Sequence, residues 1–121
     1  MKGEKFIILD VSGVGYKIFL SRKNLLKAPG IGGDFEVFCF LNIRDDIREL
    51  YGFLSYKELE FFEILNDISG IGPKTAIEIA SIATSEEIKT AIKNNDKKII
   101  EEIFEIGKKK AQAIISTISN D

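Results

Sequence analysis

The chain has 121 residues with 45% hydrophobic and 30% charged side chains and a formal net charge of −2 at pH 7, proportions typical of a globular protein of one domain or two very small ones. It contains no histidine and a single cysteine, Cys39, which excludes histidine-based catalysis, histidine metal sites, an internal disulfide and a zinc site of several cysteines. No apolar run approaches the roughly 20 residues of a membrane helix, and Met1–Lys5 is too short and too charged for a secretion signal.

The first half of the chain has the residue pattern of short β-strands. Four runs rich in β-branched and aromatic residues predict strands at Phe6–Val11, Val14–Leu20, Phe35–Ile43 and Ile47–Phe53. A Ser-Gly turn pair at 12–13 separates the first two, and a charged tip at 44–46 separates the last two. Short antiparallel strands without intervening helices predict a small barrel or sandwich. The third run is apolar on both faces, so we expect it to be buried, with Cys39 in the core.

From Ser55 onward the apolar residues recur with the period of a helix. Apolar side chains at i, i+3, i+4 and i+7 predict helices through 61–68, 76–83 and 111–118. Thr84 followed by Glu87 predicts a capping box, and Asp96 is expected to cap a helix over Lys97–Phe104. The apolar stripes are interpreted as core rather than as a binding site.

The helical half repeats itself at an offset of 35 residues. Three aligned pairs illustrate the repeat: Ile64 with Ile99, Gly72 with Gly107, and Lys74 with Lys109. Each copy predicts a helix, a tight hairpin containing glycine and a second helix, which is the helix-hairpin-helix pattern. One Gly-x-Gly between two helices is an ordinary turn, whereas two copies at one offset, each with a lysine in the same place, favour DNA binding.

The hairpin and the start of the following helix favour a phosphate ligand. Glycine lets the backbone adopt a positive φ, which we expect at Gly72, and lets a ligand approach without meeting a Cβ. The first-turn amides of the next helix point outward at the positive end of its dipole, and Lys74 or Lys109 adds a mobile cation. Such contacts carry no base-sequence information. Although the net charge is negative, Lys108 and Lys110 flank Lys109 in a local basic patch that can direct binding.

Four segments resemble the RuvA family of Holliday-junction-binding proteins, in the same order and at similar spacing: Val11–Tyr16, Arg44–Asp46, Leu50–Phe53 and Ser69–Lys74. The resemblance covers residues 6–118. It implies two small domains, all-β then all-α: an OB-fold-like β-barrel over residues 1–54 and a tandem helix-hairpin-helix DNA-binding domain over residues 55–121. It also implies a homotetramer that holds a four-way DNA junction open on one flat face and passes it to the motor ATPase RuvB. On this resemblance we expect a cytoplasmic, non-catalytic subunit acting in recombination, repair and the SOS response, with no cofactor and no membrane partner.

The resemblance also assigns site residues by position. The DNA phosphate-binding residues are those of the two hairpins: Gly70, Ile71, Gly72, Lys74, Thr75, Ile106, Gly107, Lys108, Lys109 and Lys110. Asp45 and Asp46 match the acidic pin, a pair of acidic residues that projects at the centre of the tetramer, where the four strands cross over. Like charge there repels phosphates and helps to separate the strands.

The sequence departs from the family pattern at three places. Glu105 stands where the family has the first glycine of the second hairpin, which puts a carboxylate beside the expected phosphate. Only Met1–Lys5 precede the first predicted strand, so we expect a barrel one strand short, with an open edge. The chain stops at Asp121, where the family continues into a linker and a small C-terminal domain that engages the motor, so that domain is expected to be absent.

Two other functions are compatible with the sequence. A DNA-cutting enzyme, a nuclease or glycosylase, would use Asp45 and Asp46 as Mg²⁺ ligands, but adjacent residues usually point apart and the sequence shows no convergent third carboxylate nearby. A scaffolding subunit that no longer binds DNA would account for the acidic balance and for Glu105.

Overall fold

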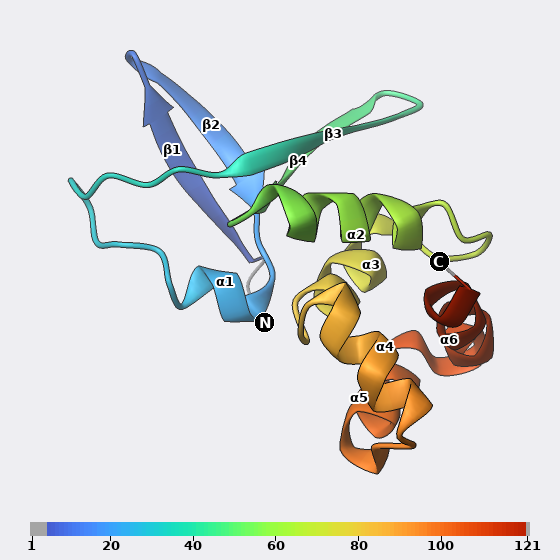
Figure 1. Ribbon diagram of the computed structural model, residues 1–121. Coiled ribbons are helices and arrows are strands. Elements are labelled where there is room, and N and C mark those ends of the chain that lie inside the picture. The colour runs from blue at the N-terminus through green and yellow to red at the C-terminus, as the bar shows by residue number, and fades with distance from the viewer. Residues whose placement is uncertain (1–4, 121) are drawn as a thin grey trace. The chain divides into compact units, whose positions relative to one another are not determined.

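The computed structural model describes residues 5–120, and the chain divides between Leu59 and Glu60 into a β unit and a helical unit. Figure 1 follows the chain through the strands, with a short helix among them, and then through the longer helices. The dividing point falls inside helix α2 (Tyr56–Asn66). A β unit followed by a helical unit confirms the predicted fold class. The expectation drawn from Met1–Lys5, a missing first strand, falls largely on residues 1–4, which lie outside the described residues.

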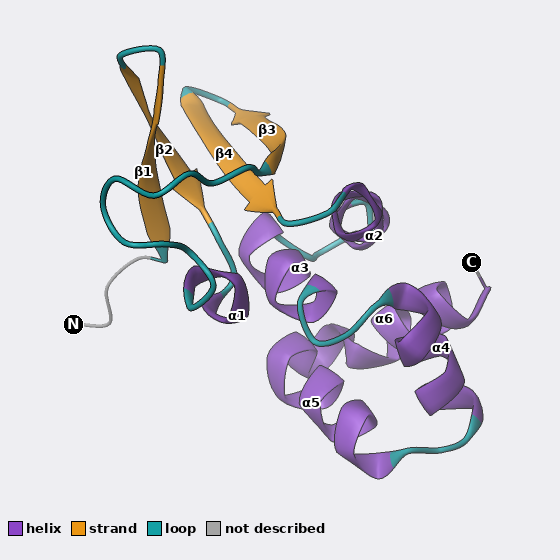
Figure 2. Ribbon diagram, turned by 60° about the vertical axis from the view of Figure 1, so that its left-hand side comes forward, coloured by secondary structure: helices purple, strands orange, loops and turns teal. Residues whose placement is uncertain are grey.

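The β unit holds a four-stranded sheet in the order β1-β2-β4-β3. Its strands are β1 (Phe6–Val11), β2 (Val14–Phe19), β3 (Phe38–Arg44) and β4 (Ile47–Phe53). The pairs β1/β2 and β3/β4 are antiparallel, as predicted, whereas β2 and β4 pair in parallel at Ile18 and Phe19, which the sequence pattern did not predict. Within residues 5–120 no pairing joins β1 to β3, so this sheet keeps two edges (Figure 2).

Strand β3 is shorter and more exposed than predicted. It pairs with β4 from Phe38, opposite the last residue of β4, Phe53, so Phe35–Val37 lie beyond the end of that partner strand. Leu41 is 50% exposed, and Cys39 is exposed as well. The expected burial of this strand on both faces, with Cys39 in the core, is therefore wrong, because β3 is an edge strand of a sheet that does not close over it. Partial burial still raises the pKa of the Cys39 thiol, which keeps it protonated at neutral pH.

The core of the β unit lies where β2 and β4 pair. The rings of Phe19 and Tyr51 are stacked, with their centroids 5.4 Å apart. A Cβ on Gly52 would lie 2.7 Å from Ile18 Cγ2 and 2.9 Å from Leu20 Cδ2. Glycine at position 52 is therefore what allows these two buried side chains to pack against the backbone of β4.

A short helix, α1 (Arg22–Leu25), follows β2 and is fixed by buried polar groups. The Ser21 hydroxyl caps it by accepting a hydrogen bond from the Asn24 amide, at 3.1 Å. Asn24 Nδ2 in turn donates to Glu58 Oε1 at 2.8 Å, and the Leu54 amide donates to the same carboxylate oxygen at 3.1 Å. This network ties α1 to the residues where α2 begins, and satisfies the buried amide of Asn24.

The helical unit follows the predicted periodicity. Its elements after α2 are α3 (Pro73–Ala80), α4 (Ser85–Lys93), α5 (Lys97–Gly107), the 3-10 turn η1 (Lys108–Lys110) and α6 (Ala111–Asn120). The predicted capping box is confirmed: the Thr84 amide donates to Glu87 Oε1 at 2.9 Å, and the Glu87 amide donates to Thr84 Oγ1 at 3.1 Å. Asp96 Oδ1 caps α5 by accepting from the Lys98 amide at 3.1 Å.

The core of the helical unit contains the predicted apolar stripes. Fully buried members of these stripes and of the helices between them are Ala76, Ile79, Ile88, Ile103, Ala111 and Ile114. They come from α3, α4, α5 and α6, so each helix of the unit contributes side chains to one core. Burial of these apolar stripes, rather than intrinsic helix propensity, stabilises helices as short as these.

We predict that Gly52→Ala lowers the free energy of unfolding by about 1–3 kcal/mol, because the added methyl group would overlap Ile18 and Leu20. Gly30→Ala is the matched control, since a Cβ there would meet nothing within 4 Å. The control should leave stability unchanged or raise it by up to about 1 kcal/mol. Urea unfolding of the two variants measures the difference, and equal unfolding free energies would contradict the packing role of Gly52.

Candidate nucleic-acid interface

The first hairpin joins α2 to α3 through residues 67–72. Its turn is closed by a hydrogen bond from the Ile71 amide to the Ile68 carbonyl at 3.1 Å, and Gly70 has φ +85°. Ile71 is buried and holds the hairpin on the core, whereas Gly70 and Gly72 on either side of it are exposed. The hairpin therefore presents glycine backbone to solvent at two points, as the sequence pattern indicates.

Gly72 is the N-cap of α3, and its backbone is extended, with φ −87° and ψ 169°. The predicted positive φ at Gly72 is wrong, because the left-handed residue of this hairpin is Gly70. A Cβ at Gly72 would meet nothing within 4 Å, so the space in front of α3 is open. Pro73 occupies the first helical position, and the first helical hydrogen bond runs from the Ala76 amide to the Gly72 carbonyl at 3.1 Å. The amides of Lys74 and Thr75 precede that bond, at the end of the helix that attracts anions.

The second hairpin has a different backbone. Glu105, the counterpart of Gly70, is helical, and α5 continues through it to Gly107, which has φ −83° and ψ −18°. Helix α5 thus runs three residues past the predicted end at Phe104. A side chain disfavours positive φ, so Glu105 lets the helix continue where glycine lets the first copy turn. The two copies of the motif therefore differ in backbone at the position where the sequence departs from the family pattern.

The chain reverses instead at Lys108, which has φ 49° and ψ −119°. This region of the backbone map favours glycine and is strained for other residues. Lys108, Lys109 and Lys110 then form the single turn η1, and all three side chains are exposed. The predicted basic patch is therefore at the surface, on a 3-10 turn.

Gly107 is buried, unlike its counterpart Gly72. A Cβ there would lie 2.6 Å from Ile114 Cδ1 and 3.9 Å from Ile79 Cδ1. The missing side chain lets α5 pack closely against buried residues of α6 and α3. In the second copy the glycine at the same motif position therefore serves packing.

The two copies meet at Gly70 and Lys110. A Cβ built on Gly70 would lie 2.7 Å from Lys110 Nζ and 3.4 Å from Lys110 Cδ, with Cε closer still. The side chain of Lys110 therefore lies across the exposed face of Gly70. The sequence placed both residues in phosphate-binding hairpins, but gave no sign that they touch.

Asp45 and Asp46 form the turn between β3 and β4 and are exposed. Asp45 has φ 53°, a conformation that aspartate and asparagine tolerate better than most residues other than glycine. The β1–β2 turn is built in a similar way, with Ser12 at φ 53° and Gly13 at φ 89°. Asp45 and Asp46 are thus at a hairpin tip, as predicted.

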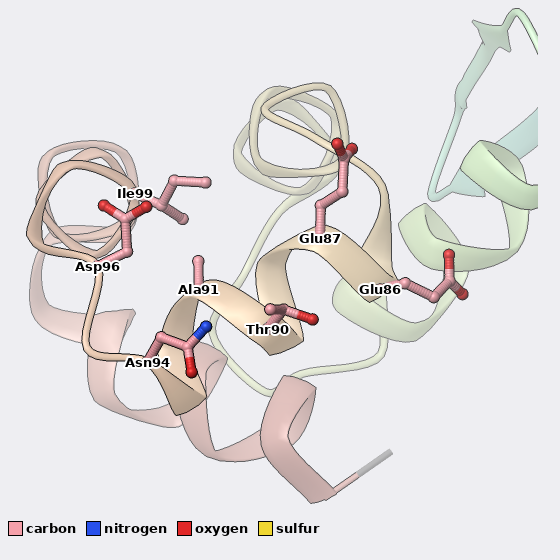
Figure 3. A pocket seen from close by; sticks show the side chains of 7 residues that line it. All are labelled: Glu86, Glu87, Thr90, Ala91, Asn94, Asp96 and Ile99. Carbon is pink, nitrogen blue, oxygen red and sulfur yellow. The ribbon is translucent and has the colours of Figure 1, made fainter.

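A shallow pocket of the helical unit lies outside the two hairpins, between α4 and the start of α5 (Figure 3). Its lining residues are Glu86, Glu87, Thr90, Ala91, Asn94, Asp96 and Ile99. Glu87 and Asp96 already accept hydrogen bonds from helix-capping amides, and the carboxylates repel phosphate. Among residues 5–120 no group of three or more His, Cys, Asp or Glu side chains is placed to hold a metal ion. No helix in this part of the chain is long and apolar enough to cross a membrane.

Each half of the chain matches a known protein family. Residues 1–52 match the family described as "RuvA N terminal domain", and residues 62–120 match the family described as "SAM-like Helix-hairpin-helix tandem". Relatives from Rickettsia bellii, Acetivibrio thermocellus and Clostridium perfringens are 40%, 39% and 37% identical to the chain over 117, 114 and 110 residues. Each is named "Holliday junction branch migration complex subunit RuvA". The alignments cover 97%, 94% and 91% of this chain but 57%, 56% and 55% of the relatives, so the chain spans about half their length.

We predict that Lys108→Gly raises the free energy of unfolding by about 1 kcal/mol, because glycine relieves the strain at φ 49°. Lys109→Gly, one residue along the same turn, is the control and should lower stability by about 0.5–1 kcal/mol, since its φ is not positive. Thermal and urea unfolding measure both changes. Destabilisation of the same size in the two variants would contradict the strain at Lys108.

Proposed function

The chain belongs to the RuvA family in the two domains that it spans, and on that premise we propose that it binds four-way (Holliday) DNA junctions through their phosphates. The observation that carries this proposal is the first hairpin. Exposed glycine backbone at Gly70 and Gly72, open space in front of α3 and the exposed Lys74 occur together there. These features suit an anion that approaches a helix N-terminus closely.

The chemistry of this site determines what kind of recognition we propose. Backbone amides and lysines contact phosphate oxygens, which are the same in every base pair, so the site selects the path of the backbone and not its sequence. The net charge of −2 limits the general electrostatic attraction of the chain to DNA. DNA affinity therefore depends on the local arrangement of the hairpins and of the lysines at 108–110. Selectivity for a junction then follows from the geometry in which several such sites are presented.

We further propose the assembly that the family resemblance implies. In it, the chain is the non-catalytic DNA-recognition subunit of a branch-migration complex in the cytoplasm, it acts as a homotetramer, and an ATPase of the RuvB type supplies the motor. A physical argument favours a repeated, multivalent arrangement, because single phosphate contacts are too weak to hold a junction alone.

Within that tetramer we propose that Asp45 and Asp46 act as the acidic pin. Four copies bring eight carboxylates together around one axis, where they repel one another and repel phosphate. Continuous duplex is thereby excluded from the centre, whereas a junction whose strands part there is admitted. The exposure of both residues at the β3–β4 turn supports this role.

Binding should be selective for DNA structure, indifferent to base sequence and strongly dependent on salt. With 6–10 phosphate contacts in the assembly, junction affinity should fall by about 10³–10⁵-fold between 50 and 200 mM salt. Gel shifts with four-way junctions of two unrelated arm sequences, and with linear duplexes of the same sequences, measure all three properties. An affinity for the junction that depends on arm sequence, or equal affinity for junction and duplex, would count against the proposal.

Replacing both pin residues by asparagine should raise affinity for duplex more than affinity for the junction. Asparagine keeps the size of the side chain and tolerates the positive φ of Asp45, so the turn is preserved while the charge is removed. At charge separations of about 8 Å in water each repulsive pair contributes roughly 0.5 kcal/mol before screening, so several pairs predict a severalfold loss of selectivity. Unchanged selectivity in a variant that still forms tetramers would remove the pin from the mechanism.

A further inference from the structure

Lys110 belongs by sequence to the second hairpin but lies on the first. Its Nζ is 2.7 Å from the position that a Cβ of Gly70 would occupy, and its Cδ is 3.4 Å from the same point. Gly70 is exposed and lies two residues before the N-cap of α3. The end of the lysine side chain therefore lies where a Cβ at position 70 would stand, close in sequence to the start of α3.

The internal repeat explains why this contact is specific to one hairpin. At the offset of 35 residues Lys110 is the counterpart of Thr75, and Gly70 is the counterpart of Glu105. The reverse arrangement would need a long cation at 75 and an uncharged, side-chain-free residue at 105. The chain has neither, so its sequence provides one such lysine contact and not two.

We propose that Lys110 is a second cation of the first hairpin, beside Lys74, and that Lys110 binds the same phosphate as the amides at the start of α3. This inference rests on the proposed function, and it makes Lys110 part of the phosphate site of the first hairpin instead of part of an independent site on η1. Lys110 is exposed, so its ammonium group remains available to a ligand, while its aliphatic stem packs over Gly70.

Lys109 is the matched control for Lys110. Both lysines lie in η1, both are exposed, and both carry the same charge. Lys109 is also the residue that the repeat aligns with Lys74, so the motif alone predicts that it matters more than Lys110. The structure predicts the opposite order.

The first experiment tests the contact in the protein without DNA. The amide resonance of Gly70 should shift in Lys110→Gln and remain in place in Lys109→Gln, measured by ¹H–¹⁵N correlation spectra of the whole chain. An unmoved Gly70 resonance in Lys110→Gln would overturn the proposal whatever the DNA measurements show.

The second experiment is a double-mutant cycle on junction binding at low salt, with Lys74→Gln as the variant of the first hairpin. Lys110→Gln should weaken binding about tenfold, as expected for the loss of one charge-assisted contact, and should lower the salt slope by about 1. Its effect should depend on Lys74, so that the double variant deviates from the product of the two single effects. Lys109→Gln should weaken binding less, and its effect should multiply with that of Lys74→Gln.

The outcomes separate this inference from the function on which it rests. A wild-type chain that shows no preference for junctions overturns both. If the wild-type chain binds junctions, two results overturn this inference and leave the proposed function standing. One is that Lys109→Gln and Lys110→Gln weaken binding equally. The other is that the effect of Lys110→Gln on binding is independent of Lys74. Circular dichroism and thermal unfolding of each variant show that the changes in binding are not losses of fold.

Discussion

The left-handed backbone conformation of Gly70 is the constraint on which the first hairpin depends. At φ +85° a Cβ would be strained in any case, and here it would also collide with the side chain of Lys110. This one residue lets the chain turn sharply after α2, so that Ile71 reaches the core and Gly72 can cap α3 in an extended conformation. The exposed start of α3, which is the proposed phosphate site, is a consequence of that turn.

The second copy of the motif shows what happens without the glycine. Glu105 favours continuation of α5, the helix runs on to Gly107, and the reversal is moved to the strained residue Lys108. The glycine that remains, Gly107, is buried against Ile114 and serves packing. Two copies that are related by sequence have therefore diverged in form. On our proposals one copy binds a phosphate, and the other supports it through Lys110.

Much of the architecture could be predicted from the sequence because local signals are strong in this chain. The β-branched runs, the box of Thr84 and Glu87 and the apolar stripes each depend on neighbours a few residues away, and each is confirmed. The failures concern contacts between distant parts of the chain. Periodicity does not show that β2 and β4 pair in parallel or that β3 lies at an edge, so the exposure of Cys39 was mispredicted. The motif located both hairpins, but which glycine takes a positive φ, and that Lys110 reaches Gly70, depend on packing between the two copies.

On our proposals the two hairpins differ in function because they differ in backbone. Amide chemical shifts of the labelled chain, recorded as a four-way junction is added at low salt, test this difference. We expect the largest changes at Gly70, Gly72, Lys74 and Thr75, with smaller changes at the backbone amides of 105–107. Changes of equal size at both hairpins, or changes confined to 105–110, would contradict the proposed difference.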